Sequence, residues 1–207
     1  MTENLKYIKK ENTDKLTVKD LISLGLYNLL IILLMGVGVG VCAAFFSLTF
    51  NGQYYFAIFT TVGTGLFAGP AFSIIFNKIR KKYAILITTF IQAVFLLLSG
   101  HAAIAFFVTI VAAFLAEYFF RKNNEYLSYL AYTFGGIGAI LPVYFMRDSY
   151  IQHLADKGYS QEKIDFIMHS SSLSVFIAVI VFTVIFTLLG TYIGRKIYFR
   201  NFDKAGI

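Results

Sequence analysis

Six long apolar segments, separated by short polar stretches, dominate the chain. A bilayer core is about 30 Å thick and an α-helix rises about 1.5 Å per residue, so a transmembrane helix needs roughly 17–25 apolar residues. The segments have this length. The pattern predicts an all-α integral membrane protein with one domain, residues 1–207, made of a cytoplasmic tail at 1–20 and six transmembrane helices at about 21–46, 55–77, 83–99, 102–120, 126–145 and 172–194.

Local signals mark the start of the first segment and a bend in the second. Thr17 and Asp20 have the spacing of a capping box, in which the two side chains satisfy the first free amides of a helix. Gly69-Pro70 lies inside the second segment, and proline removes one backbone donor and clashes with the preceding turn. We therefore expect a helix from about Leu21 and a kink at Pro70.

The longest polar stretch between apolar segments is 147–171, and its pattern predicts two short helices. Asp148 can cap the first, Gly158 can end it and Ser160 can cap the second. The second helix carries apolar side chains at helical spacing on one face, namely Ile164, Ile167 and Met168. The stretch predicts a helical lid that packs its apolar side onto the mouth of the bundle, between the fifth and sixth helices.

Composition supports a membrane protein, and the position of the charges predicts its orientation. The chain is 58% hydrophobic and 14% charged, whereas soluble domains average about 45–50% apolar and about 25% charged. Of the 18 lysines and arginines, 15 fall on the side that holds both termini and 3 on the other. The positive-inside rule then places both termini in the cytoplasm of a bacterial cell and the lid outside. Because the basic residues flank apolar segments, we expect a lipid bilayer as partner and no nucleic acid.

Polar and aromatic side chains at the outer ends of the segments are the candidate solute-binding residues. Arg147 can pair with a carboxylate or phosphate, with Asp148 orienting it. An interfacial ion pair with a helix cap is the preferred interpretation, because polar residues at the mouth of a bundle are often structural. The tyrosines also suit an interfacial aromatic belt. The candidates, chosen by position, are Asn51, Tyr54, Tyr55, His101, Tyr144, Met146, Arg147, Asp148, Tyr150, His153, Met168 and His169.

Three histidines on the predicted outer side raise the question of a metal or haem. A histidine with Met146 or Met168 can ligate a haem iron, but no HxxxH or CxxC spacing is present. Hydrogen-bonded loop histidines are the simpler interpretation. We predict no metal site and no intrinsic cofactor, and keep haem as an alternative solute.

No catalytic motif is recognisable, and no enzyme activity is expected. The chain has no P-loop, nucleophile elbow, HExxH or dinucleotide-binding fingerprint. Glu117 is an acid inside an apolar segment, which can mark a functional site. Arg121 follows it four residues later, so an interfacial ion pair is the preferred interpretation. Sixteen residues of helix, roughly 24 Å, would separate Glu117 from His101.

Small residues recur every four positions in the first segment, at Gly36, Gly40 and Ala44. Such residues let helix backbones approach closely. They predict either packing inside the bundle or a docking face for another membrane subunit.

Four stretches resemble the Trep_Strep (MptD-like) group of substrate-binding S components of energy-coupling factor (ECF) transporters. They are KLTVKDLISLGLYN, FAGPAFSIIFNKIRKK, LPVYFMRDSYIQHLADKGYSQEKID and GRKIYFRNFDKAGI. The resemblance implies a six-helix subunit with both termini inside that captures a vitamin or similar micronutrient under its extracellular loops. Its partners would be an EcfT-like transmembrane coupling protein and two EcfA-like ATPases, which use ATP. The small residues of the first helix lie in its outer half, unlike the usual docking motif of S components.

Three functional hypotheses follow. The first is the S component, including a variant that imports haem or another metal cofactor. The second is an intramembrane enzyme, which would need acids and histidines at one depth. The third is a standalone small-molecule transporter, which usually shows ionisable residues near the midplane or broken helices in matched halves.

Overall fold

Long apolar helices make up most of the chain in a computed structural model, which describes residues 15–49 and 55–202. No strand occurs in this part of the chain. In order, the elements are α1 (Val18–Thr49), α2 (Tyr55–Phe67), α3 (Gly69–Lys78), α4 (Ala84–Leu98), α5 (Ala103–Arg121), α6 (Glu125–Gly135), the 3₁₀ turn η2 (Gly136–Ala139), α7 (Leu141–Phe145), α8 (Arg147–Asp156), α9 (Gln161–Ser170), α10 (Leu173–Ile197) and the π-helical turn η3 (Tyr198–Phe202).

Three of the described helices are long and apolar enough to cross a membrane: α1, α5 and α10 with its extension to Asn201. The pair α2–α3 makes a fourth if the two helices count as one bent span. The 15 residues of α4 span only about 22 Å. The expected fifth helix is interrupted. The six expected regions are therefore all helical, but length and composition support three or four spans.

Two breaks in the helices have local causes in the sequence. The predicted kink at Gly69-Pro70 is confirmed, because α2 and α3 meet there at 50°. The prediction of one continuous helix over 126–145 is wrong, since η2 separates α6 from α7. Glycines at 135, 136 and 138 weaken the helix, and Pro142 has no N–H to continue the hydrogen-bond ladder.

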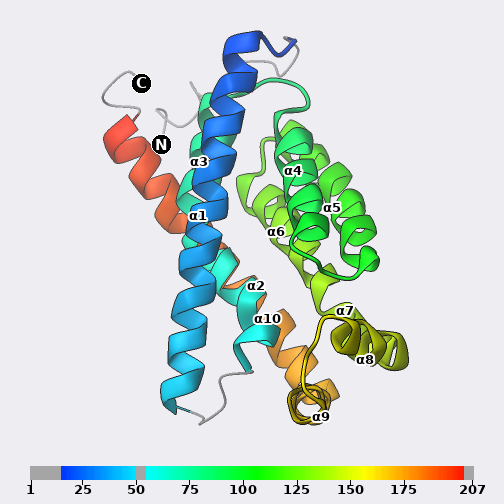
Figure 1. Cartoon of the computed structure of the whole chain (residues 1–207). Coiled ribbons are helices and arrows are strands. Elements are labelled where there is room, and N and C mark those ends of the chain that lie inside the picture. The colour runs from blue at the N-terminus through cyan, green and yellow to red at the C-terminus, as the bar shows by residue number, and fades with distance from the viewer. Residues whose placement is uncertain (1–14, 50–54, 203–207) are drawn as a thin grey trace.

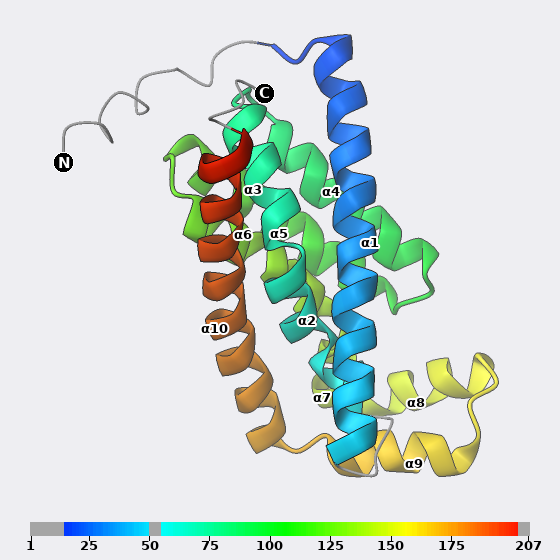
Figure 2. The ribbon, with the colours of Figure 1, turned by 90° about the vertical axis from the view of Figure 1, so that its left-hand side faces the viewer.

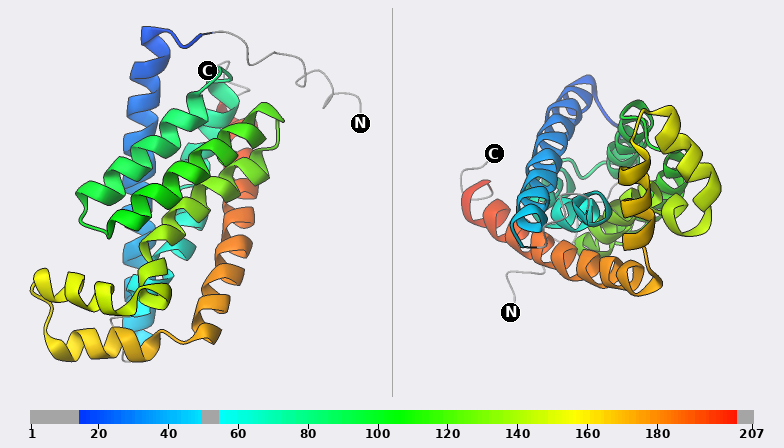
Figure 3. Two further views of the ribbon diagram at one scale, coloured as in Figure 1. Left: turned by 90° about the vertical axis from the view of Figure 1, so that its right-hand side faces the viewer. Right: turned by 60° about the horizontal axis from the view of Figure 1, so that its bottom comes forward.

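The helices form two groups (Figures 1 and 3). Helices α4, α5 and α6 pack side by side in chain order, whereas α2 and α3 pack between α1 and α10. Glycine pairs allow the closest crossings in the second group. A Cβ added to Gly38 of α1 would lie 2.6 Å from the carbonyl of Gly63 in α2, and one added to Gly190 of α10 would lie 2.1 Å from the carbonyl oxygen of Gly65.

The two ends of the bundle differ in character. The start of α1, the α3–α4 and α5–α6 loops and the end of α10 lie at one end, whereas α8 and α9 cross the opposite end (Figure 2). At the first end the expected Arg121–Glu117 ion pair is confirmed at 3.1 Å. Glu117 also accepts from the backbone amides of Tyr83 and Leu86, which begin α4. These bonds give the Glu117 carboxylate a structural role, since it holds the start of α4 against α5.

The helix caps agree with those predicted from the sequence, with one exception. Thr17 and Asp20 form the predicted capping box, and Ser160 accepts from the amide of Lys163 at the start of α9. Gly158 has the left-handed φ of +77° that ends a helix. The cap predicted for Asp148 is wrong: α8 begins one residue earlier, at Arg147, and Asp148 lies in its first turn. A carboxylate there still interacts favourably with the helix dipole.

Large apolar side chains cover the outside of the bundle. Leu26, Leu33, Phe107, Val111 and Phe114 are each at least 60% exposed. In α1 only a narrow stripe is buried, at Leu24, Asn28, Ile31, Met35 and Gly38. Soluble monomers rarely expose so much contiguous apolar surface. The exterior is therefore suited to lipid.

Candidate functional site

A cavity of about 430 Å³ lies at the α8–α9 end of the bundle. Its walls come from α1, α2, α4, the α4–α5 loop, α6, η2 and α7, and residues of α8 and α9 line it at the end of the bundle. Binding sites for small molecules typically measure about 300–1,000 Å³. The cavity is therefore large enough for a small organic solute.

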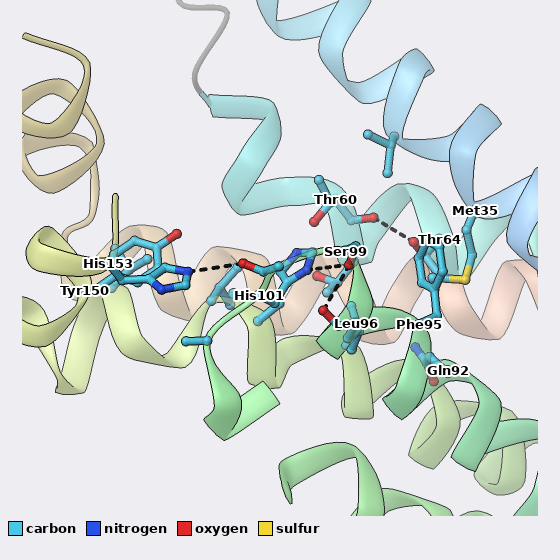
Figure 4. A pocket seen from close by; sticks show the side chains of 18 of the residues that line it. Met35, Thr60, Thr64, Gln92, Phe95, Leu96, Ser99, His101, Tyr150 and His153 are labelled. Carbon is cyan, nitrogen blue, oxygen red and sulfur yellow. Dashed lines mark hydrogen bonds between the residues drawn. The ribbon is translucent and has the colours of Figure 1, made fainter. Parts of the chain in front are cut away.

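Figure 4 shows two chemically different ends of this cavity. Tyr150 and His153 lie at the end near α8, and the other end holds Met35, Thr64, Phe95 and Gln92, with Ser99 and His101 between them. We call the end near α8, together with Ser99 and His101, the rim, and the other end the inner end. None of the described lining residues is acidic.

Gln92 is the distinctive residue of the inner end. It lies on α4 and is only 3% exposed. Neither its amide nitrogen nor its amide oxygen has a hydrogen-bond partner among the described residues. A buried polar group without a partner costs roughly 1–3 kcal/mol, and such a group in a native structure calls for an explanation. A solute or an ordered water in the cavity supplies one.

Two threonines that line the same cavity as Gln92 have already donated their hydroxyl protons. The Thr64 hydroxyl donates to the carbonyl of Thr60 and the Thr133 hydroxyl to that of Tyr129, both at 3.0 Å. A hydroxyl has one proton and two lone pairs, so these two groups can still accept but cannot donate to a solute.

Gly136 lies next to the amide of Gln92 and adds no side chain there. A Cβ at this position would lie 3.6 Å from Gln92 Nε2 and 3.3 Å from Thr61 Cγ2. The glycine has ordinary helical angles, φ −65° and ψ −22°. Its role here is therefore space beside Gln92 and not an unusual backbone conformation.

The rim is basic and hydrogen-bonded. Ser99 Oγ donates to the carbonyl of Leu96 and lies 2.9 Å from His101 Nδ1, so neutral His101 carries its proton on Nδ1. His153 Nε2 lies 3.1 Å from the carbonyl of Gly100, which joins α8 to the α4–α5 loop. The Lys157 ammonium reaches over Gly100: a Cβ there would be 2.7 Å from Nζ.

The surroundings of His101 oppose its protonation. Its side chain is exposed at the rim, but the protein around the ring still desolvates it, which lowers its pKa below the ordinary 6.5. A hydrogen bond to Leu96 acts in the opposite direction, and the positive charges of Lys157 and His153 add to the lowering. His101 is therefore neutral at pH 7.

The α8–α9 unit has an apolar core of its own. Leu154, Ile164, Ile167 and Met168 are buried together with Val143 of α7. The face predicted from the spacing of Ile164, Ile167 and Met168 is thus confirmed. Arg147 Nη2 donates to the Met168 carbonyl at 3.0 Å and links the start of α8 to the end of α9.

Of the candidate residues predicted by position that the structure describes, only three line the cavity. His101, Tyr150 and His153 line the cavity. Asn51 and Tyr54 lie outside the described residues, and Tyr55 begins α2. Tyr144 packs on Phe176. The remaining candidates belong to the α8–α9 unit or its edge and do not line the cavity: Met146, Arg147, Asp148, Met168 and His169. Binding by any of these residues stays a prediction.

The small residues predicted for partner docking lie largely on the outside of α1. Nothing lies within 4 Å of a Cβ built on Gly36 or Gly40, and Ala44 is exposed. Gly36 also lines the cavity. The close crossing of α1 with α2 uses Gly38 instead. A docking role for the outer face of α1 stays a prediction.

The inner end was missed in the sequence, although one signal pointed to it. Gln92 is the one amide in the apolar helix AILITTFIQAVFLLL, and polar residues inside a membrane are expensive unless they have a function or a partner. Among the described residues no group of three or more histidines, cysteines or acids could hold a metal ion.

Comparison with known proteins gives one family. The model of a family described as "hypothetical bacterial integral membrane protein (Trep_Strep)" matches residues 18–204. The chain belongs to this family of bacterial integral membrane proteins. No curated protein and no solved structure matches the chain.

Proposed function

We propose that this member of the Trep_Strep family is the solute-binding S component of an ECF importer, which captures a vitamin-like micronutrient from outside the cell. The observation that carries the proposal is the cavity of about 430 Å³ that places the unpartnered amide of Gln92 beneath the α8–α9 unit. Its size and its mainly apolar lining with a few polar groups are typical of small-molecule sites.

The proposed orientation follows from the separation of charge between the two ends of the bundle. Most of the lysines and arginines belong to the end that holds the start of α1 and the end of α10. By the positive-inside rule this end is cytoplasmic, and α8–α9 form an extracellular lid. The proposal includes six spans, with α4 and the broken α6–α7 segment completing the bundle.

The proposed mechanism is capture without covalent chemistry. The solute enters beneath α8–α9, the lid closes on it, and the whole subunit then presents it to the cytoplasm with an EcfT-like coupling protein and two EcfA-like ATPases. A solute can change the state of the protein only if it binds the two states with different affinity. A closed lid that adds contacts from Tyr150 and His153 meets this condition.

Retention of a solute tests the proposal directly. The full chain is purified in mild detergent and denatured, and the released small molecules are identified by mass spectrometry. We expect one compound at close to one per chain. Arg147→Ala removes the bond between the two lid helices and should lower retention several-fold, whereas Glu162→Gln on the exposed side of α9 should match the wild type.

Two outcomes would contradict the proposal. The first is a wild-type chain that releases no compound. The second is an identified compound that liposomes containing the chain, the coupling protein and the ATPases fail to import when ATP is supplied inside. Import without those partners would favour a standalone transporter instead.

A haem-importing variant is the second candidate, because His101 and His153 both line the cavity. The first has a free Nε2 lone pair when neutral. The same mass spectrometry decides between the two, since a released tetrapyrrole would identify the variant.

A further inference from the structure

We infer that the solute carries an amide-type edge, an N–H donor beside a C=O or ring-nitrogen acceptor, and that Gln92 recognises this edge. The inference rests on the proposed solute-capture function and names the class of solute. Lactam, ureide and amidine rings present such an edge.

Gln92 can donate and accept hydrogen bonds through one side-chain amide. Its planar amide presents N–H donors on one side and a carbonyl acceptor on the other. Both atoms are buried and unpartnered. Glutamine and asparagine make paired bonds of this kind with the edges of nucleobases, where donor and acceptor lie side by side. The complement of Gln92 is therefore an edge with both functions.

Two of the lining threonines, Thr64 and Thr133, can accept a hydrogen bond from a solute but cannot donate one. Thr64 and Thr133 have donated their protons to backbone carbonyls. They remain acceptors. The inner end thus favours a ring with additional N–H groups around its edge, which these hydroxyl oxygens can accept.

The shape of the inner end suits a flat ring. Met35 and Phe95 line it with apolar surface, and Gly136 leaves space beside Gln92 Nε2. Aromatic side chains and methionine sulfur both make favourable contacts with ring systems. A planar heterocycle can contact Phe95 with its face or edge while its polar edge meets Gln92.

The charge of the lining limits the rest of the solute. No acid is among the described lining residues, whereas Lys157 lies at the rim and no acid in the described part of the chain pairs with it. A cationic solute would lose its hydration without gaining a counter-charge. The inferred solute is therefore a neutral or anionic heterocycle, whose anionic group, where it has one, lies toward Lys157.

Both amide atoms of Gln92 need hydrogen-bond partners when no solute is bound, and water is the available alternative. A water can bond to each amide atom of Gln92, and a solute that displaces it without replacing both bonds loses affinity. An N-methyl group at the recognised edge removes the donor and adds bulk. Methylation is thus a sensitive probe of the inferred contact.

The experiment uses four lactam or ureide probes: uracil, orotate, hypoxanthine and pterin, each with its ring-N-methylated analogue. Binding to the purified full chain is measured by calorimetry after any retained compound has been exchanged out. We expect at least one probe to bind and methylation to weaken it roughly 10- to 100-fold, the range for one bidentate pair. Nicotinate, a ring acid without such an edge, should not bind.

Three variants locate the contact. Gln92→Leu should remove the difference between a probe and its methylated analogue, and Gln92→Glu should lose the donor while keeping the shape. Thr89→Val is the matched control: Thr89 is buried on the same helix, donates to Ile85 and does not line the cavity. Gln92→Leu also removes an unpartnered amide and should not lower thermal stability, so lost binding cannot be attributed to misfolding.

The outcomes separate this inference from the proposed function. Failure of all four probes, or unchanged discrimination in Gln92→Leu, overturns the inference. If the chain nevertheless retains a different compound, the capture function stands without it. If the chain neither retains a compound nor binds a probe, both are wrong.

Discussion

At the scale of single residues, His101 links the pH of the medium to the stability of the rim. Its pKa is lowered in the folded protein, chiefly by desolvation and further by Lys157 and His153. The unfolded chain, with an ordinary value near 6.5, therefore takes up the proton first as the pH falls. The stabilisation is complete above about pH 6.5 and is lost as the pH falls through the folded value.

The measurement is thermal unfolding of the full chain between pH 8 and pH 5. Wild-type protein should lose more stability over this range than His101→Gln, which has no proton to gain. Parallel curves for the two proteins would show that the environment of His101 does not oppose its protonation.

At the level of single residues, only part of the site could be predicted from the sequence. Candidate residues were chosen by charge, aromaticity and position, and this found His101, Tyr150 and His153. Gln92 was missed because an uncharged amide in an apolar helix changes hydropathy little. The role of Gly136 could not be predicted, since it depends on the neighbours that the fold brings to it.

At the scale of elements, glycine contacts hold α10 against α2. A Cβ at Gly190 would lie 2.1 Å from the Gly65 carbonyl oxygen and 2.9 Å from that of Leu66, both of them backbone atoms that cannot move aside cheaply. Gly190→Ala should therefore destabilise the protein by about 1–3 kcal/mol, the range for overpacking. The measurement is the midpoint of unfolding in detergent.

Gly25→Ala is the matched control. Gly25 lies in α1 with nothing within 4 Å of an added Cβ. Alanine favours a helix over glycine by up to about 1 kcal/mol, so this variant should be neutral or stabilising. Equal destabilisation by both variants would mean that the close crossing does not set the stability.

Helix position was predictable where the signal was local. The capping box at Thr17, the bend at Pro70 and the stop at Gly158 all follow from backbone chemistry within a few residues. The break at Gly136–Ala139 was not predicted, because hydrophobicity continues through it. Close packing stabilises the irregular turn there: a Cβ at Gly138 would be 3.0 Å from Ala105 Cα.

At the scale of the whole molecule, the proposed orientation makes a direct prediction. Cys42 is replaced by alanine, and single cysteines are introduced as Gln161→Cys on α9 or Lys122→Cys after α5, both exposed positions at opposite ends of the bundle. A membrane-impermeant maleimide should label the first in intact cells and the second only after permeabilisation.

The reverse labelling pattern would place α8–α9 in the cytoplasm and exclude capture from outside. Labelling of both positions in intact cells would instead indicate mixed insertion. The sequence predicted this topology from the distribution of lysine and arginine alone, which is a whole-chain property. It could not predict the cavity, since its walls come from helices far apart in the chain.

The connection between α9 and α10 has a mechanical consequence. Helix α10 begins at Leu173, shortly after the end of α9, and runs about 37 Å to its end. Near that end Arg195 is paired with the buried Glu125 at 3.0 Å. Helix α10 thus connects α9 at one end of the bundle to the Arg195–Glu125 ion pair at the other. If α8–α9 close on a solute as proposed, α10 connects that movement to the Arg195–Glu125 contact at the opposite end of the bundle.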